Sequence, residues 1–93
     1  MNAAVEACRI DVWLFRARLV KSRGLAAALI DSGRLRLMRD GVQMRVEKPG
    51  REVRPGDEIL FARNGTLVHL RIVSTGHRRG PASEAQALYE AVD

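Results

Sequence analysis

The sequence of 93 residues predicts a single α+β domain, because its hydrophobic period changes partway along the chain. From about residue 9 to 32, apolar residues recur every three or four positions, which is typical of amphipathic helices. From residue 34 onward, apolar and polar residues alternate, which is typical of half-buried strands. We therefore expect two helices, then several short strands, and then a final helix.

The helical part is expected to be a hairpin of two short helices. The first covers residues 9–18 or 9–19, and its predicted buried face consists of Ile10, Trp13, Leu14 and Ala17. Ser22 is the expected N-cap of the second helix, which continues through Ser32, because a serine side chain accepts a backbone N–H at a helix start. The apolar stripe of this helix is predicted to be Leu25, Ala26, Leu29 and Ile30. Gly33 follows where glycine commonly ends a helix.

The strands are indicated by alternation and by turn signals. Residues 34–38 predict a strand with Arg34 and Arg36 on its open face, followed by an Asp40-Gly41 turn. Residues 42–54 have no clear period and are expected to combine a short strand with loop. Residues 58–62 and 66–73 predict two further strands, joined by Asn64-Gly65, the strongest hairpin signal in the chain.

The remaining segments divide the chain as follows. Residues 1–8 have no regular pattern and are expected to be a flexible leader. The folded domain is expected to comprise residues 9–73. Residues 74–80 are expected to be a flexible, basic linker. Residues 81–93 predict a C-terminal helix, in which Ser83 and Gln86 match a capping box.

The composition narrows the class of function. The formal net charge is +5, and all 16 basic residues except Lys21 and Lys48 are arginine. An arginine-rich, basic domain favours a polyanionic partner, since the guanidinium fork binds phosphate oxygens in pairs. A merely solvated surface, with arginine content set by genome composition, is the alternative.

The residues do not support a disulfide-bonded, zinc-binding, membrane, secreted or catalytic protein. The single cysteine, Cys8, forms no intramolecular disulfide, and with His69 and His77 far apart it predicts no zinc site. There is no apolar run of about 18 residues and no secretory signal pattern, so we expect a cytoplasmic protein. No nucleophile–base pair, paired carboxylates or glycine-rich phosphate loop is present, so we expect no catalytic residue, no metal and no cofactor.

A cluster of basic residues marks the candidate site. It lies in the helical hairpin and the strand after it, and comprises Arg9, Arg16, Arg18, Lys21, Arg23, Arg34 and Arg36. Arg9 and Arg16, seven positions apart, are expected on one helix face. Arg18, Lys21 and Arg23 surround the start of the second helix, where free N–H groups and the positive end of the helix dipole attract anions. This pattern predicts a nucleic-acid-binding surface.

Several nearby residues have a structural and a functional interpretation. Trp13 is expected in the core rather than stacked on a base, because it shares the apolar face. Asp11 is expected to orient a neighbouring arginine rather than to act as a base. Residues 77–79, His-Arg-Arg, fit a second RNA contact and a solvated linker equally well.

The hairpin residues resemble a known motif. They comprise Arg9-Ile10-Asp11-Val12-Trp13-Leu14-Phe15, Ala17-Arg18, Lys21-Ser22-Arg23, Ala26, Leu29-Ile30 and Gly33. This pattern resembles the opening of the S-four domain, the RNA-binding domain named after ribosomal protein four of the small subunit. Lys48-Pro49 and residues 53–59 resemble its second half, so the resemblance covers residues 9–62, with a departure at Gly50, where serine often follows Lys-Pro.

This resemblance implies a fold and a set of contacts. It implies a helical hairpin packed on a small twisted, mostly antiparallel sheet, whose basic hairpin surface binds structured RNA. By this resemblance the first RNA contacts are Arg9, Lys21, Ser22 and Arg23, and the next are Arg16, Arg18 and Arg36.

The C-terminal segment is similar to the end of the small ribosome-associated heat-shock protein family. The similar stretches are residues 78–85, in which Gly80 separates an arginine and a proline that are usually adjacent, and 88–90. The similarity implies a protein that binds ribosomal RNA of the large subunit, as a stress-related factor on stalled or dissociated subunits that carry a nascent chain on tRNA. We expect this protein to be a monomer without catalytic activity of its own. Two alternatives remain, namely an RNA-binding accessory subunit of an RNA-modifying enzyme and a general nucleic-acid binder that includes DNA.

Overall fold

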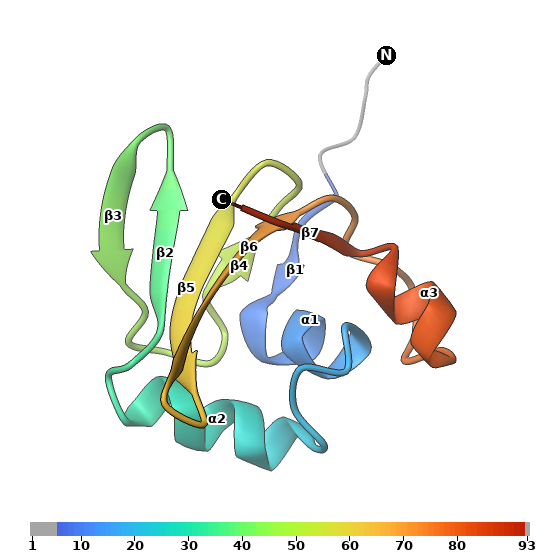
Figure 1. The fold of residues 1–93 in the computed structure, drawn as a ribbon, viewed down its shortest axis with the longest axis horizontal. Coiled ribbons are helices and arrows are strands. Elements are labelled where there is room, and N and C mark those ends of the chain that lie inside the picture. The colour runs from blue at the N-terminus through green and yellow to red at the C-terminus, as the bar shows by residue number, and fades with distance from the viewer. Residues whose placement is uncertain (1–5, 93) are drawn as a thin grey trace.

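The computed structural model describes residues 6–92, which form a curved sheet with two helices on one side and a third helix at one end (Figure 1). The elements in chain order are β1 (Cys8–Arg9), α1 (Ile10–Arg16), α2 (Arg23–Asp31), β2 (Arg36–Arg39), β3 (Val42–Arg45), β4 (Glu52–Val53), β5 (Glu58–Arg63), β6 (Thr66–Ile72), α3 (Ala82–Gln86) and β7 (Tyr89–Ala91). The larger sheet has the order β3-β2-β5-β6-β7 with every neighbouring pair antiparallel, and β1 and β4 form a separate antiparallel pair. The predicted α+β fold is confirmed.

The helical hairpin forms as its apolar spacing predicts. Ile10, Trp13, Leu14 and Ala17 are all buried. In α2 the stripe is narrower than predicted. Ala26 and Ile30 are buried and Leu29 packs against the core, but Leu25 is 52% exposed, so its predicted burial is wrong. Leu25 lies in the first turn of α2, where it lines an open hollow together with Leu19 and Val20.

The caps of α2 also follow the sequence. The Ser22 hydroxyl oxygen accepts the backbone N–H of Leu25 at 3.1 Å, as an N-cap does. Gly33 has φ of +76°, the left-handed conformation expected just beyond a helix C-terminus. Together the caps fix both ends of the helix at whose start the proposed contacts Lys21, Ser22 and Arg23 lie.

Two tight turns build the hairpins of the sheet. Asp40-Gly41 joins β2 to β3, and Asn64-Gly65 joins β5 to β6, with all four residues at positive φ. Two successive positive φ values are the geometry of the turn that matches the twist of antiparallel strands. The expected strand at 34–38 begins two residues later, because Arg34 and Leu35 form the connection from α2, although Leu35 is still buried.

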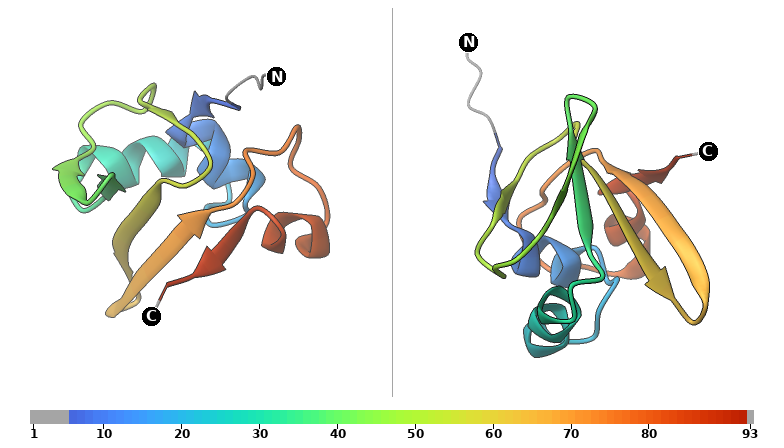
Figure 2. Two further views of the ribbon diagram at one scale, coloured as in Figure 1. Left: turned by 90° about the horizontal axis from the view of Figure 1, so that it is seen from above. Right: turned by 90° about the vertical axis from the view of Figure 1, so that its left-hand side faces the viewer.

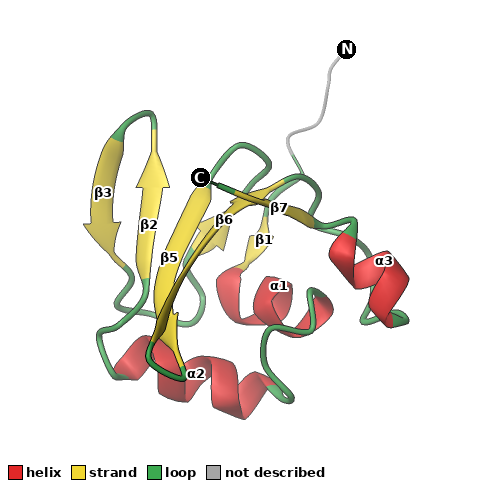
Figure 3. Ribbon diagram, viewed as in Figure 1, coloured by secondary structure: helices red, strands yellow, loops and turns green. Residues whose placement is uncertain are grey.

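The core lies between the helices and the sheet, which are coloured red and yellow in Figure 3. Trp13 is fully buried there, and its ring nitrogen donates to the Ser74 carbonyl at 2.9 Å. The core role predicted for Trp13 is therefore confirmed. Tyr89 meets the Trp13 ring edge to face, with centroids 6.4 Å apart.

The two ends of the chain differ from the sequence expectation. Residues 1–5 lie outside the described residues, but Cys8, assigned to the leader, pairs with Val53 in β1 and β4. The helix expected over 81–93 ends at Gln86, so the prediction is wrong for residues 87–92. There Tyr89–Ala91 adds an edge strand beside β6, because that arrangement satisfies strand N–H and C=O groups while burying Leu88. The predicted capping box does not form, since the α3 N-cap is Pro81.

Residues 74–80 contain no helix or strand, yet they lie against α1. Arg79 donates to the carbonyls of Phe15 and Val20, and Thr75 is buried. The views in Figure 2 show this segment running past the end of α1 before α3 begins. The segment expected to be a linker therefore forms part of the surface of the helical hairpin.

Candidate nucleic-acid interface

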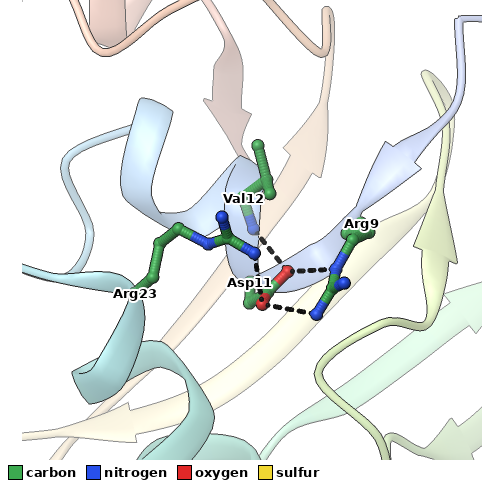
Figure 4. Close-up of polar contacts among 4 residues, drawn as sticks. All are labelled: Arg9, Asp11, Val12 and Arg23. Carbon is green, nitrogen blue, oxygen red and sulfur yellow. Dashed lines mark hydrogen bonds and ion pairs between the residues drawn. The ribbon is translucent and has the colours of Figure 1, made fainter.

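Asp11 holds two of the predicted contact residues together (Figure 4). Arg9 donates to both carboxylate oxygens of Asp11, with Nε–Oδ1 of 3.1 Å and Nη2–Oδ2 of 3.0 Å. Arg23 Nη2 lies 3.3 Å from Oδ2. The Asp11 side chain is only 6% exposed, whereas both arginine side chains are 53% exposed. One buried carboxylate thus orients two guanidinium groups that still face solvent, as predicted for Asp11.

The charge state of Asp11 supports this arrangement. Burial alone would raise its pKa, but hydrogen bonds from Arg9, Arg23 and the Val12 backbone N–H hold the pKa of Asp11 below its ordinary value. The carboxylate is therefore ionised at neutral pH. Because the arginines are restrained before any ligand arrives, a bound anion would cost less side-chain entropy.

The start of α2 is open and basic. Lys21, Ser22, Arg23 and Gly24 are all exposed, and the first turn of the helix contains no acidic residue. The atom nearest to a Cβ built on Gly24 is Ser22 Oγ at 3.8 Å, so nothing covers the helix at this point. The positive end of the dipole and the two cations therefore act on the same surface.

The loop after β3 adds basic residues that the sequence analysis did not assign to the site. A hollow of about 410 Å³ is lined by Glu47, Lys48, Gly50 and Arg51. Gly50 lies next to the Arg9 guanidinium, because a Cβ atom at this position would be 3.8 Å from Arg9 Cζ. The loop is fixed to the start of α1, because Arg51 and Pro49 carbonyls accept the N–H groups of Ile10 and Asp11. The Lys-Pro element of the resemblance was the only signal in the sequence for this contact.

Arg18 and Lys21 form a second group. They line one hollow with Arg63 and Arg79, and Arg18 Nε donates to the Gly80 carbonyl at 2.6 Å. Lys21 thus connects this group to Ser22 and Arg23. Arg63 was not predicted from the sequence, because it belongs to a strand tip distant in the chain.

The other predicted residues are not brought to the start of α2. Arg16 is half-buried and donates to the carbonyls of Thr75 and Gly76, at 3.3 and 3.0 Å. The expectation that Arg9 and Arg16 share a helix face is wrong, because Arg9 precedes the helix and turns toward Asp11. Arg34 and Arg36 lie beyond the opposite end of α2, about 12 Å away at 1.5 Å per residue, and Arg36 donates to the Gly33 carbonyl.

Within residues 6–92, no three His, Cys, Asp or Glu side chains are grouped in a way that suits a metal ion. Of the helices in that part of the chain, none is long and apolar enough to cross a membrane.

Comparison with known proteins places these features in a family. The family model of the S4 domain, the S-four domain of the sequence resemblance, matches residues 8–37, a range that contains all eight predicted contact residues. A structure described as trimeric, of heat shock protein 15 from Vibrio cholerae, is 30% identical, with a TM-score of 0.81 over 94% of this chain and 83% of that chain. The chain belongs to the heat shock protein 15 family. The predicted S-four fold and family are thereby confirmed.

Two curated relatives agree with this assignment. The heat shock protein 15 homolog of Haemophilus influenzae is 28% identical over 90 residues, which cover 97% of this chain and 65% of the relative. The homolog of Aeromonas salmonicida is 32% identical over 85 residues, which cover 91% of this chain and 61% of the relative. The chain thus spans just under two thirds of the length of these two members of the heat shock protein 15 family.

Proposed function

We propose that the protein binds ribosomal RNA of the large ribosomal subunit, without catalysis, through the surface around the start of α2. It would act in the cytoplasm as a stress-related factor on stalled or dissociated subunits that carry a nascent chain on tRNA. The proposed contacts are Arg9, Lys21, Ser22 and Arg23, with Arg16, Arg18, Arg34 and Arg36 as further candidates.

One observation carries this proposal. Cations lie at the N-terminal end of α2, where negatively charged side chains would stabilise the helix. Lys21 and Arg23 flank the N-cap, and the first turn has no acid. A positive charge there opposes the helix dipole at a cost of about 0.3–1 kcal/mol. Asp11 offsets only part of this charge, through Arg23. An RNA phosphate supplies the missing negative charge.

The expected mode of binding is electrostatic and shape-based. Structured RNA presents phosphates and 2′-hydroxyl groups to such a surface, and each neutralised phosphate releases counterions. If five contacts form, log K falls with log salt at a slope of about −3.5 to −4.5.

Sedimentation with purified large ribosomal subunits tests the proposal. We expect co-migration that increases when the subunits carry peptidyl-tRNA, and a loss of affinity of about tenfold in Lys21→Ala and Arg23→Ala. Arg54→Ala, which removes an exposed arginine from the loop after β4, is the matched control and should change little. Equal affinity in all three variants would reject this surface as the main contact.

The two alternatives predict other results. Co-purification with an RNA-modifying enzyme in place of ribosomal subunits would favour an accessory subunit. Equal affinity for duplex DNA and structured RNA at the same salt would favour a general nucleic-acid binder. The monomer expected from the sequence stays a prediction, and sedimentation velocity would distinguish it from the trimer described for the Vibrio cholerae protein.

A further inference from the structure

A concave, basic hollow lies beside the start of α2. It has a volume of about 690 Å³ and is formed by the turn between α1 and α2, the tip of the β5–β6 hairpin and the segment before α3. Its charged lining residues are Arg18, Lys21, Arg63 and Arg79, and none of its lining residues is acidic. Three separate parts of the chain therefore bring four cations to one depression.

Two of these cations are fixed in place by backbone carbonyls. Arg79 Nε donates to Phe15 O at 3.0 Å and Nη2 to Val20 O at 3.3 Å, while its guanidinium carbon lies 4.7 Å from the centre of the Phe15 ring. Arg18 donates to Gly80 O at 2.6 Å. Carbonyl acceptors orient these groups without neutralising their charge.

The hollow differs from the cluster of Arg9, Asp11 and Arg23, in which a carboxylate offsets part of the positive charge. Among residues 6–92, no ion pair involves any of its four cations. Arg78, next to Arg79 in the sequence, instead pairs with Glu84 at 2.8 Å. Four like charges that converge without a carboxylate repel one another, and an anion placed among them removes that repulsion.

The shape and the apolar lining of the hollow indicate which anion fits. Leu25 is 52% exposed and lines the same hollow, next to Lys21 and Val20. An apolar contact beside a phosphate site suits a ribose or a base attached to that phosphate. Guanidinium groups also match phosphate oxygens in pairs.

We propose that this hollow is a second RNA contact, which binds a phosphodiester of the RNA together with its adjoining nucleoside. The inference rests on the proposed function, since the RNA that meets Arg23 at the start of α2 would continue past Lys21 into the hollow. It assigns RNA-binding roles to Arg63 and Arg79, and it explains why Leu25 is left exposed in an otherwise buried stripe.

Arg63→Gln is the informative variant. The Arg63 side chain is exposed at the end of β5, and no side-chain hydrogen bond involves it within the described part of the chain, so its replacement should leave the fold intact. Arg54→Gln is the matched control, with the same change of charge on an exposed arginine that lies outside the hollow. Arg79→Lys, which keeps the charge but removes the guanidinium fork, is a second test.

The probes are purified large ribosomal subunits and a 5′-phosphorylated hexauridylate. On both, we expect Arg63→Gln to lower affinity about 5- to 10-fold and to flatten the salt slope by about 0.7–0.9. Arg54→Gln should stay within about twofold of the unmodified protein because Arg54 makes no proposed contact. Circular dichroism melting would verify that each variant is folded.

The outcomes separate this inference from the proposed function. If Arg23→Ala weakens subunit binding while Arg63→Gln and Arg54→Gln behave alike, the hollow is rejected and the proposed function stands. If the protein fails to bind large subunits, the proposed function fails and the hexauridylate decides the hollow. Weaker hexauridylate binding by Arg63→Gln than by Arg54→Gln would then support the hollow, and equal binding would overturn it.

Discussion

The two ends of helix α2 carry the same kind of side chain under opposite electrostatic conditions. At the N-terminal end, Lys21 and Arg23 oppose the helix dipole and are exposed. At the C-terminal end, Arg36 donates to the Gly33 carbonyl, and the Arg45 guanidinium lies against Gly33. Cations at this second end satisfy carbonyls and favour the dipole.

This difference distinguishes basic residues that stabilise the fold from basic residues that are available to bind a ligand. Arg36 and Arg45 at the C-terminal end have a folding role that is sufficient to explain them, whatever else they contact. The cations before α2 have no such explanation, apart from the ion pair of Arg23 with Asp11. We therefore assign the main RNA contact to the N-terminal end, and Arg34 and Arg36 stay predictions as RNA contacts.

Removing the Asp11 carboxylate should have the largest effect on stability. Asp11→Asn removes the negative charge and one of the two acceptor oxygens that Arg9 and Arg23 share, and we expect it to lower the free energy of unfolding by about 2 kcal/mol at pH 7. Because the folded pKa of Asp11 lies below its unfolded value, its contribution is present above the unfolded pKa and is lost as pH falls through the folded pKa. Urea unfolding from pH 7 to pH 2 should therefore show the two proteins converging below about pH 4. A difference that is independent of pH would contradict the ionised clamp.

Two glycine substitutions sharpen the comparison between the ends of α2. Gly33→Ala places a Cβ at φ of +76° and against the Arg45 guanidinium, so we expect a loss of about 1–2 kcal/mol without a change in RNA affinity. Gly24→Ala adds a better helix former in open space, so we expect a gain of up to about 1 kcal/mol. Thermal unfolding measures both changes. Equal effects on stability at the two positions would contradict the capping geometry described for Gly33.

Local signals predicted much of the fold and part of the site. The Ser22 cap, the left-handed Gly33 and the Asn64-Gly65 turn each depend on residues within a few positions, so the sequence alone was sufficient. The orienting role of Asp11 toward an arginine was also predicted, because Arg9 lies two positions away. The S-four resemblance then supplied the arrangement of hairpin and sheet.

Long-range contacts account for what the sequence could not predict. Arg16 follows the helical pattern of its neighbours, but its acceptors are carbonyls about 60 positions later. Arg79 is a candidate RNA contact in the sequence, but its partners in α1 and the following turn are about as far away along the chain. Tyr89–Ala91 fits a helical spacing as well as a strand, and its pairing with β6 decides between them. Sequence periodicity carries no information on such distant partners.

The central claim is that the cations at the start of α2 serve RNA binding at a cost to helix stability. Its most direct test compares Lys21→Glu with Arg34→Glu, in which the same charge reversal is made at either end of the helix. For Lys21→Glu we predict an unfolding free energy raised by about 0.5 kcal/mol and an affinity for large ribosomal subunits reduced at least about tenfold. For Arg34→Glu we predict a stability that does not rise and an affinity reduced less than about threefold. A Lys21→Glu protein that is destabilised, or that binds as well as the Arg34→Glu protein, would contradict the account.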